Sequence, residues 1–142
     1  MYSHILVPVD LDTPSDWTVT LPRAVSLARL TGARLHILTV VSSFGSSVVG
    51  EFFPGAMERN VANTLLATLK QRTDTAVPED IPVQNMVVEG QGDEAVLRMA
   101  EQVKADLIVI GGKGTDLGRL LPGPRAARVV RRASCSVLVV RE

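Results

Sequence analysis

The sequence predicts an α/β fold in which a parallel sheet of five strands is covered by helices on both faces. Five short runs rich in Val, Ile and Leu predict the strands, at 5–9, 35–41, 83–88, 106–110 and 136–140. Continuous apolar runs of this length are typical of strands that are buried on both faces. Longer segments with helical spacing separate them, and strands that alternate with helices need crossover connections. The 142 residues fit one domain, 1–142.

The first connection predicts a helix that ends at residue 31. Thr13 followed by Pro14 is a good helix start, because Thr can cap the helix and Pro suits its first position. Gly32 suits the left-handed stop. Pro22 conflicts with a continuous helix from residue 14, so we expect either a kink or a firm start near Thr20.

The remaining connections predict three further helices. Met57, Val61, Leu65 and Leu69 recur at i, i+4 spacing and predict four to five turns, followed by a polar return over 73–82. Asp93 is expected to cap the next helix. The last helix is predicted over 123–133. In the first strand, Pro8 is expected to end pairing early, because it lacks an N–H.

Composition excludes several classes of function. Lys+Arg and Asp+Glu both number 15, so the global positive field that drives nucleic-acid binding is absent. No apolar run approaches the length of a membrane span. The single cysteine excludes an internal disulfide, and we expect a cytoplasmic protein. Cys135 itself is expected to be a buried small hydrophobe. His4 and His36 stand apart from any nucleophile or ligand set and are interpreted as structural, so no metal site is expected.

Five of the 11 glycines lie between residues 111 and 123, after the fourth predicted strand and before the last predicted helix. Glycine tolerates positive φ and lets a backbone approach a ligand closely, and a helix start offers free N–H groups. Ligands of open α/β sheets bind outside the carboxyl ends of the strands. The cluster therefore predicts a phosphate site, with Lys113 and Arg125 placed to neutralise charge. The alternative is a loop of tight turns beside a solvated basic face.

Three segments resemble the universal stress protein family. They are ILVPVD at 5–10, ADLIVIG at 105–111 and RRASCSVLVVR at 131–141. The resemblance extends over the whole chain and implies a single universal stress protein domain. It also implies a Rossmann-like, adenine nucleotide alpha hydrolase-like sheet with strand order 3-2-1-4-5.

The glycine loop resembles the ATP-binding branch of that family, whose pattern is G-x2-G-x9-G-[ST]. Gly111, Gly114 and Gly123 match its glycines, but only eight residues separate the last two, and Pro124 stands where Ser or Thr is usual. The shorter spacing is similar to the F-type subgroup. Proline supplies neither hydroxyl nor N–H, so its presence is expected to weaken nucleotide affinity about 10–150-fold.

Matching positions one by one, the resemblance implies a nucleotide site. Pro8, Val9 and Asp10 would lie near adenine and ribose, and the backbone of Val40 near the adenine edge. The ribose and phosphates would be lined by Ile110, Gly111 and Gly114, and the phosphates faced by Gly123, Pro124, Arg125 and Ala126.

These observations predict a regulatory protein that binds ATP, AMP or a related adenine nucleotide without catalysis. Asp10 and Asp12 could hold Mg²⁺ beside the phosphates; the favoured alternative makes Asp12 an exposed turn residue. A second hypothesis is an interaction protein whose site is degenerate because of Pro124, and a slow ATPase is a third. The uncharged strand 136–140 is expected to form a sheet edge, and the resemblance implies a homodimer through it.

Overall fold

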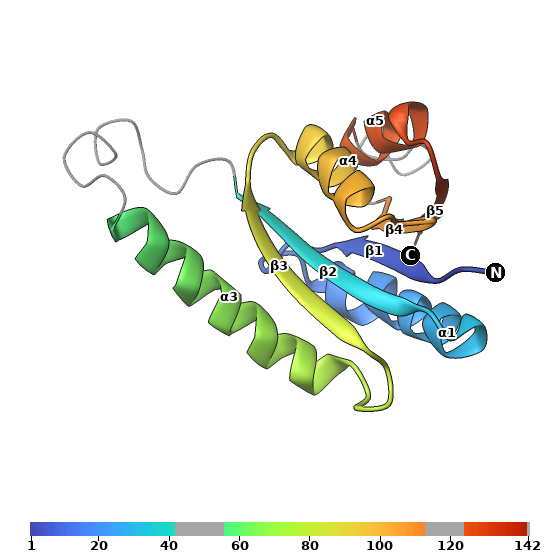
Figure 1. Ribbon diagram of the computed structural model, residues 1–142, viewed down its shortest axis with the longest axis horizontal. Coiled ribbons are helices and arrows are strands. Elements are labelled where there is room, and N and C mark those ends of the chain that lie inside the picture. Colours follow the sequence, from blue (N-terminus) through green and yellow to red (C-terminus); the bar gives the residue numbers. More distant parts are fainter. Residues whose placement is uncertain (42–55, 113–123, 142) are drawn as a thin grey trace.

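The computed structural model describes residues 1–41, 56–112 and 124–141, which form one five-stranded parallel sheet (Figure 1). The sheet has the order β3-β2-β1-β4-β5, as the resemblance implied. All five predicted strands are confirmed, with bounds that shift by one residue at most. They are β1 (His4–Pro8), β2 (Arg34–Val41), β3 (Val83–Glu89), β4 (Leu107–Gly111) and β5 (Ser136–Val140).

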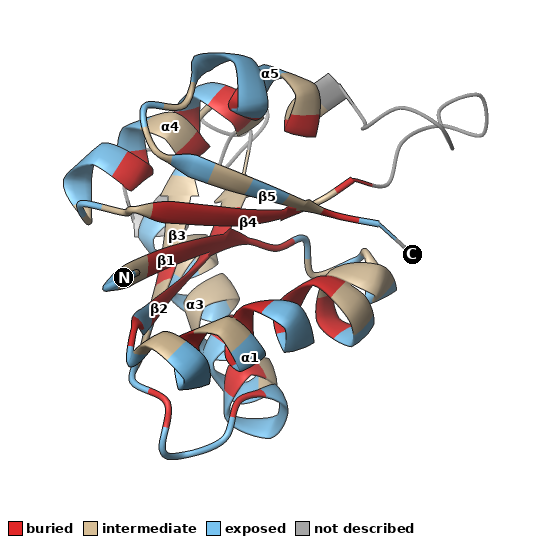
Figure 2. Cartoon of the chain, turned by 90° about the vertical axis from the view of Figure 1, so that its right-hand side faces the viewer, coloured by how far each residue is buried: buried red, intermediate tan, exposed pale blue. Residues whose placement is uncertain are grey.

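Helices cover both faces of the sheet, as predicted (Figure 2). Helices α1 (Leu21–Thr31) and α3 (Ala56–Ala76) lie on one face, and α4 (Gly92–Gln102) and α5 (Pro124–Arg132) on the other. The alternation of strand side chains separates two cores. Odd-numbered residues of β1 such as Ile5 and Val7 pack towards α1 and α3, whereas Leu6 packs towards α4 and α5.

The conflict that Pro22 creates in the first helix is resolved by a change of helix type. Residues Asp16–Thr20 form a π-helical segment, η1, directly before α1. The N–H of Leu21 donates to the carbonyl of Asp16, five residues back. A π turn inserts one extra residue, so the chain widens where an α-helix would clash with the proline ring. Gly32 ends α1 with φ +75°, as predicted.

Pro8 ends strand pairing on one side of β1 only. The register with β2 continues to Pro8 and Leu38, and the N–H of Val9 still donates to the carbonyl of Leu38 at 2.8 Å. The register with β4 extends only from Ile5 to Leu6. Successive residues of a strand point their N–H groups to opposite sides, so the missing N–H of Pro8 faces β4. The prediction that strand pairing ends early at Pro8 is therefore confirmed for the pair β1–β4 and wrong for the pair β1–β2.

Two boundary predictions are wrong for tertiary reasons. Helix α3 has 21 residues and extends into the segment predicted as a polar return. Thr73 belongs to this helix because it is buried and its hydroxyl lies 2.7 Å from Oδ1 of Asn85 on β3. Asp93 does not cap α4, since the N-cap is Gln91. Asp93 is instead a buried residue of the first turn.

His4 and His36 are not isolated from each other, contrary to the sequence interpretation. Nδ1 of His4 lies 3.0 Å from Nε2 of His36, and Nδ1 of His36 lies 2.7 Å from Oε1 of Gln84. Because Gln84 Oε1 only accepts, His36 carries its proton on Nδ1 and accepts from His4 through Nε2. These two hydrogen bonds link β1, β2 and β3, and burial lowers the pKa of His36.

Candidate functional site

The predicted site lies at the carboxyl edge of the sheet, where β1 and β4 diverge. The chain leaves β1 towards η1 and leaves β4 towards α5, so the strand order reverses between these two neighbours. Such a reversal is where open α/β sheets bind ligands. The loss of pairing after Leu6 widens the gap between the strand ends. Val9 and Ile110 at these ends are buried.

The turn after β1 is held in shape by four hydrogen bonds around Asp10. Its N–H donates to Oδ2 of Asp16 at 2.8 Å, and its Oδ1 accepts from the N–H of Asp12 at 2.9 Å. Its carbonyl accepts from Nε1 of Trp17 at 3.1 Å and from the N–H of Thr13 at 3.2 Å. Asp10 is therefore an exposed acid on a fixed backbone beside the predicted ligand position.

Asp16 and Thr20 also contact this edge, and sequence reasoning missed them. A Cβ added to Gly111 would lie 2.9 Å from Oδ1 of Asp16 and 3.0 Å from Oγ1 of Thr20. The π segment brings both side chains to the end of β4, because its extra residue rotates them relative to an α-helix. Pro22 within an amphipathic helix was the signal that could have indicated this change of phase.

The two glycines that end β4 are required for close packing. Neither Gly111 nor Gly112 has a positive φ. A Cβ on Gly112 would lie 2.7 Å from Cγ1 of Val139, and its N–H donates to the carbonyl of Val140 at 2.8 Å. The sequence analysis expected the glycine cluster to provide conformational freedom, but Gly111 and Gly112 do not use it. Glycine is required there because a side chain would collide with Asp16 and Thr20 of η1 at Gly111, and with Val139 of β5 at Gly112.

Arg125 extends from the start of α5 to the start of α4. A Cβ on Gly92 would lie 3.7 Å from both Cδ and Nε of Arg125. Nε and Nη2 of Arg125 are buried, and neither has a hydrogen-bond partner in the described part of the chain. The next residue, Ala126, is buried in the core beneath α5. Arg125 therefore contacts the first residue of α4, while Ala126 anchors α5 in the core.

Several predicted site residues are only partly placed. Val40 lies near the end of β2, paired with Val88 of β3 and next to β1 in the sheet. Pro124 is the first residue of α5. Lys113, Gly114 and Gly123 lie outside the described residues.

A metal cluster is not found within residues 1–41, 56–112 and 124–141, where no group of three His, Cys, Asp or Glu side chains could hold an ion. Asp12 is an exposed turn residue, as the favoured interpretation had it. Oδ1 of Asp10 accepts from the N–H of Asp12, so the two acids are joined by a turn bond.

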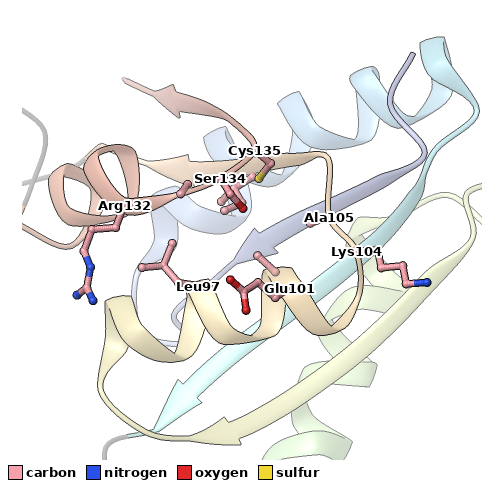
Figure 3. Close-up of a pocket in the computed structure, with 10 residues that line it drawn as sticks. Leu97, Glu101, Lys104, Ala105, Arg132, Ser134 and Cys135 are labelled. Carbon is pink, nitrogen blue, oxygen red and sulfur yellow. The ribbon is translucent and has the colours of Figure 1, made fainter.

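A cavity of about 370 Å³ lies at the opposite, amino edge of the sheet (Figure 3). It is formed by the end of α4, the end of α5 and the segments before β4 and β5. Leu97, Ala105 and Ile108 give it apolar walls, and Glu101 borders it. Cys135 also lines it and is half-buried, less so than predicted. Burial raises the pKa of its thiol, so the thiol stays protonated at neutral pH.

Comparison with known proteins identifies the family. The family model described as "Universal stress protein family" matches residues 1–141. The chain belongs to this family. A Staphylococcus aureus (strain USA300) protein named as a universal stress protein is 29% identical over 145 residues, which cover 99% of this chain and 84% of the relative.

Solved structures of the family share the fold. Universal stress protein UspA from Lactobacillus plantarum is 26% identical with a TM-score of 0.74, covering 99% of this chain and 98% of that one. A universal stress protein in complex with cAMP is 27% identical with a TM-score of 0.68, covering 99% and 97%. The Archaeoglobus fulgidus protein in complex with dAMP is 19% identical with a TM-score of 0.66, covering 99% and 98%.

Helices long and apolar enough to cross a bilayer are absent from the described residues.

Proposed function

We propose that this universal stress protein is a regulatory protein that binds an adenine nucleotide at the carboxyl edge of its sheet. The observation that carries the proposal is the gap between the ends of β1 and β4, bordered by Asp10 on one side and by the start of α5 on the other. The relative solved with cAMP supports an adenine ligand with a phosphate. In this proposal Val9 and Ile110 provide the apolar floor, and Asp10 faces the ribose.

The finer part of the proposal concerns which nucleotide binds. AMP and ATP share the adenine, ribose and first phosphate, so they would use the same strand ends. Pro124 supplies no hydroxyl or N–H for the phosphates beyond the first, which favours AMP over ATP. Mg²⁺ would accompany ATP through its phosphates, because the described residues offer no cluster of three ligands.

Isothermal titration calorimetry with AMP, ATP with and without Mg²⁺, adenosine and GMP tests the proposal. Binding of AMP with weaker binding of GMP is the expected result. Asp10→Asn should weaken AMP and adenosine alike, because it removes a charged acceptor beside the ribose. Asp12→Asn, on an exposed neighbour, is the matched control. If no binding heat is measured with any adenine compound at millimolar concentration, the proposal that an adenine nucleotide is the ligand is rejected.

The competing hypothesis is an interaction protein with a degenerate site. It is favoured by Pro124, the one position where the family pattern calls for a hydroxyl. Under this hypothesis the protein as it stands does not bind ATP, and Pro124→Ser gains affinity. Under the leading proposal the protein already binds AMP, and the substitution adds affinity mainly for ATP. Measuring both nucleotides with both forms separates the hypotheses.

The proposal includes a homodimer formed through β5. This strand is an edge of the sheet and pairs only with β4 among the described strands. Leu138 on β5 is 39% exposed, although it is a large apolar residue in a strand. An exposed apolar edge favours pairing with a second copy. Sedimentation velocity should show a dimer that Leu138→Lys dissociates. A monomer at high micromolar concentration in the unchanged protein would contradict this part.

The proposed role is binding without catalysis in the cytoplasm. A candidate general base and nucleophile pair is not visible among the described residues of the site, although arginines are placed there, with Arg72 donating to the carbonyl of Leu11 and Arg125 at the start of α5. We expect ATP hydrolysis to stay far below about 1 s⁻¹, the lower end of typical enzymes. Release of inorganic phosphate measured over hours tests this, and turnover near that rate would make the protein an ATPase.

A further inference from the structure

Arg72 of α3 contacts the turn that follows β1 at two points. Its Nη1 donates to the carbonyl of Leu11, the residue between Asp10 and Asp12. Its guanidinium carbon also lies 4.2 Å from the centroid of the Trp17 ring, within the range of a cation–π interaction. Arg72 is half-buried and Trp17 is 8% exposed, so water screens this contact only in part. One side chain of α3 therefore holds the turn near both of its ends.

Both contacts depend on the shape of the arginine side chain. A guanidinium is planar, so its face can stack on an aromatic ring while the N–H donors at its edge bind a carbonyl oxygen. The contacts with Leu11 and Trp17 use the edge and the face at the same time. A lysine keeps the charge and the donors but has no planar face to stack on the ring. The turn therefore requires the guanidinium group and not a positive charge alone.

Helix α3 provides a fixed base for Arg72. Leu69, three residues before it, is fully buried in the core beneath the helix. Thr73, the next residue, is buried, and its hydroxyl lies 2.7 Å from Oδ1 of Asn85 on β3. These two contacts fix the helix against the sheet on both sides of Arg72 in the sequence. The guanidinium is thus held at a defined place relative to the sheet.

The other hydrogen bonds of the turn join its residues to one another. The four hydrogen bonds of Asp10 all end within the segment 10–17. They set the shape of this segment but do not attach it to α3. In the described part of the chain, the bond from Arg72 to Leu11 makes that attachment. Asp10 itself is exposed, so its position depends on the turn and not on core packing around its side chain.

We propose that Arg72 is a positioning residue of the nucleotide site, which attaches the turn after β1 to α3 and so holds Asp10 in place. The inference rests on the proposed function, in which Asp10 faces the ribose. A turn that is fixed before the ligand arrives does not have to be ordered on binding, so affinity is gained without a further contact to the ligand. Because AMP and adenosine share the ribose, Arg72 supports the binding of both equally.

Calorimetry with AMP and adenosine tests this role in Arg72→Met, which keeps an unbranched side chain but removes the charge and the donors. We expect both ligands to bind about 3–10-fold more weakly. Arg98→Met is the matched control, because Nη2 of Arg98 also donates to a backbone carbonyl, that of Glu89 at 3.1 Å, but at the end of β3. It should change neither affinity. Arg72→Lys keeps a charged donor and should recover part of the loss. Equal effects of Arg72→Met and Arg98→Met would overturn the inference.

A double-mutant cycle separates positioning from a general loss of stability. If Arg72 acts through Asp10, Arg72→Met should weaken AMP clearly less in the Asp10→Asn background than in the unchanged protein. Losses that simply add would contradict the proposed action through Asp10. Urea unfolding confirms that each variant folds, and Arg72→Lys takes the place of Arg72→Met in the cycle if the latter does not fold.

Hydrogen exchange of the Trp17 indole tests the attachment without any nucleotide. Trp17 is the only tryptophan, so its Nε1–H gives a single indole resonance by NMR, and this group donates to the carbonyl of Asp10 at 3.1 Å. Arg72→Met should make its exchange with solvent several-fold faster, whereas Arg98→Met should not. An unchanged exchange rate in Arg72→Met overturns the inference. If the unchanged protein binds neither AMP nor adenosine, the proposed function fails, and the exchange rate alone decides whether Arg72 holds the turn.

Discussion

Gly111→Ala should distort the edge of the sheet where the proposed ligand binds. The new Cβ would lie 2.9 Å from Oδ1 of Asp16 and 3.0 Å from Oγ1 of Thr20. These separations are about 0.5 Å and 0.4 Å inside the 3.4 Å at which ordinary contact begins. Thr20 is buried and cannot turn away freely. Asp16 is tied through its Oδ2 to the N–H of Asp10. One of the two side chains must therefore move with its segment.

The expected cost follows from these two constraints. Forcing one extra carbon into a packed position usually costs about 1–3 kcal/mol. If Asp16 yields instead, the charged hydrogen bond to Asp10 is lost, which costs about 1.5–3 kcal/mol when buried and less at this partly exposed position. Both routes give a loss of about 1–3 kcal/mol in the free energy of unfolding. With a urea m-value of about 2 kcal/mol/M, the midpoint falls by about 0.5–1.5 M.

Urea unfolding of Gly111→Ala, Asp16→Ala and the double variant measures this coupling. Removing the carboxylate removes the nearest obstacle, so Gly111→Ala should cost clearly less in the Asp16→Ala background. Gly92→Ala is the control, because its nearest neighbours lie at 3.7 Å and no clash results. An equal cost of Gly111→Ala in both backgrounds would refute the assigned contact.

Three further predictions concern stability. Burial, more than the charges of His4 and Arg34, lowers the pKa of His36, although the hydrogen bond to Gln84 opposes this shift. The unfolded chain then binds more protons than the folded one, so the free energy of unfolding should fall as pH drops from 6.5 through the folded pKa. His36→Gln should flatten the dependence of the urea-derived free energy of unfolding on pH. Parallel pH profiles of the two proteins would contradict the assignment to His36. Lys104 has φ +57°, so Lys104→Gly should gain about 0.5–1 kcal/mol in thermal unfolding, whereas Lys104→Ala should gain nothing. Trp17→Phe should lose about 1 kcal/mol with the Nε1 bond to Asp10, and an unchanged midpoint would argue against that bond.

The strands were predictable because their signal is local. Runs such as 106–110 are buried on both faces, so nearly every side chain is apolar, and the run itself marks the strand.

Helix ends were less predictable where a tertiary contact decides them. Thr73 reads as polar and loop-like in the sequence, yet its hydroxyl lies at hydrogen-bond distance from Asn85 on β3, and α3 extends to Ala76. The partner is 12 residues away, beyond the reach of helical periodicity.

The sequence assigned the candidate site through the glycine cluster and, residue by residue, through the family resemblance, but it did not indicate the supporting contacts. The structure places Val9, Asp10 and Ile110 at the ends of β1 and β4 and Arg125 at the start of α5. Asp16 could not be located in the same way. In an α-helix beginning at residue 14, its direction would differ by about 100° for each residue of offset. The π turn supplies one residue of offset. The periodicity of an α-helix therefore does not predict that the Asp16 side chain points to the backbone of Asp10 and holds it.

The significance of Arg125 depends on how charges pair between α4 and α5. In the sequence it is one of four arginines in the last helix, and a solvated basic face explains all of them equally well. Asp93 was interpreted as a helix cap, which would have directed its oxygens to backbone N–H groups. The structure directs them to Arg128 and Arg132 instead. Among the described residues, that pairing leaves Nε and Nη2 of Arg125 buried without a hydrogen-bond partner. Burial of a charged group is costly unless it is paired, so the proposed phosphate ligand would stabilise Arg125 in this position.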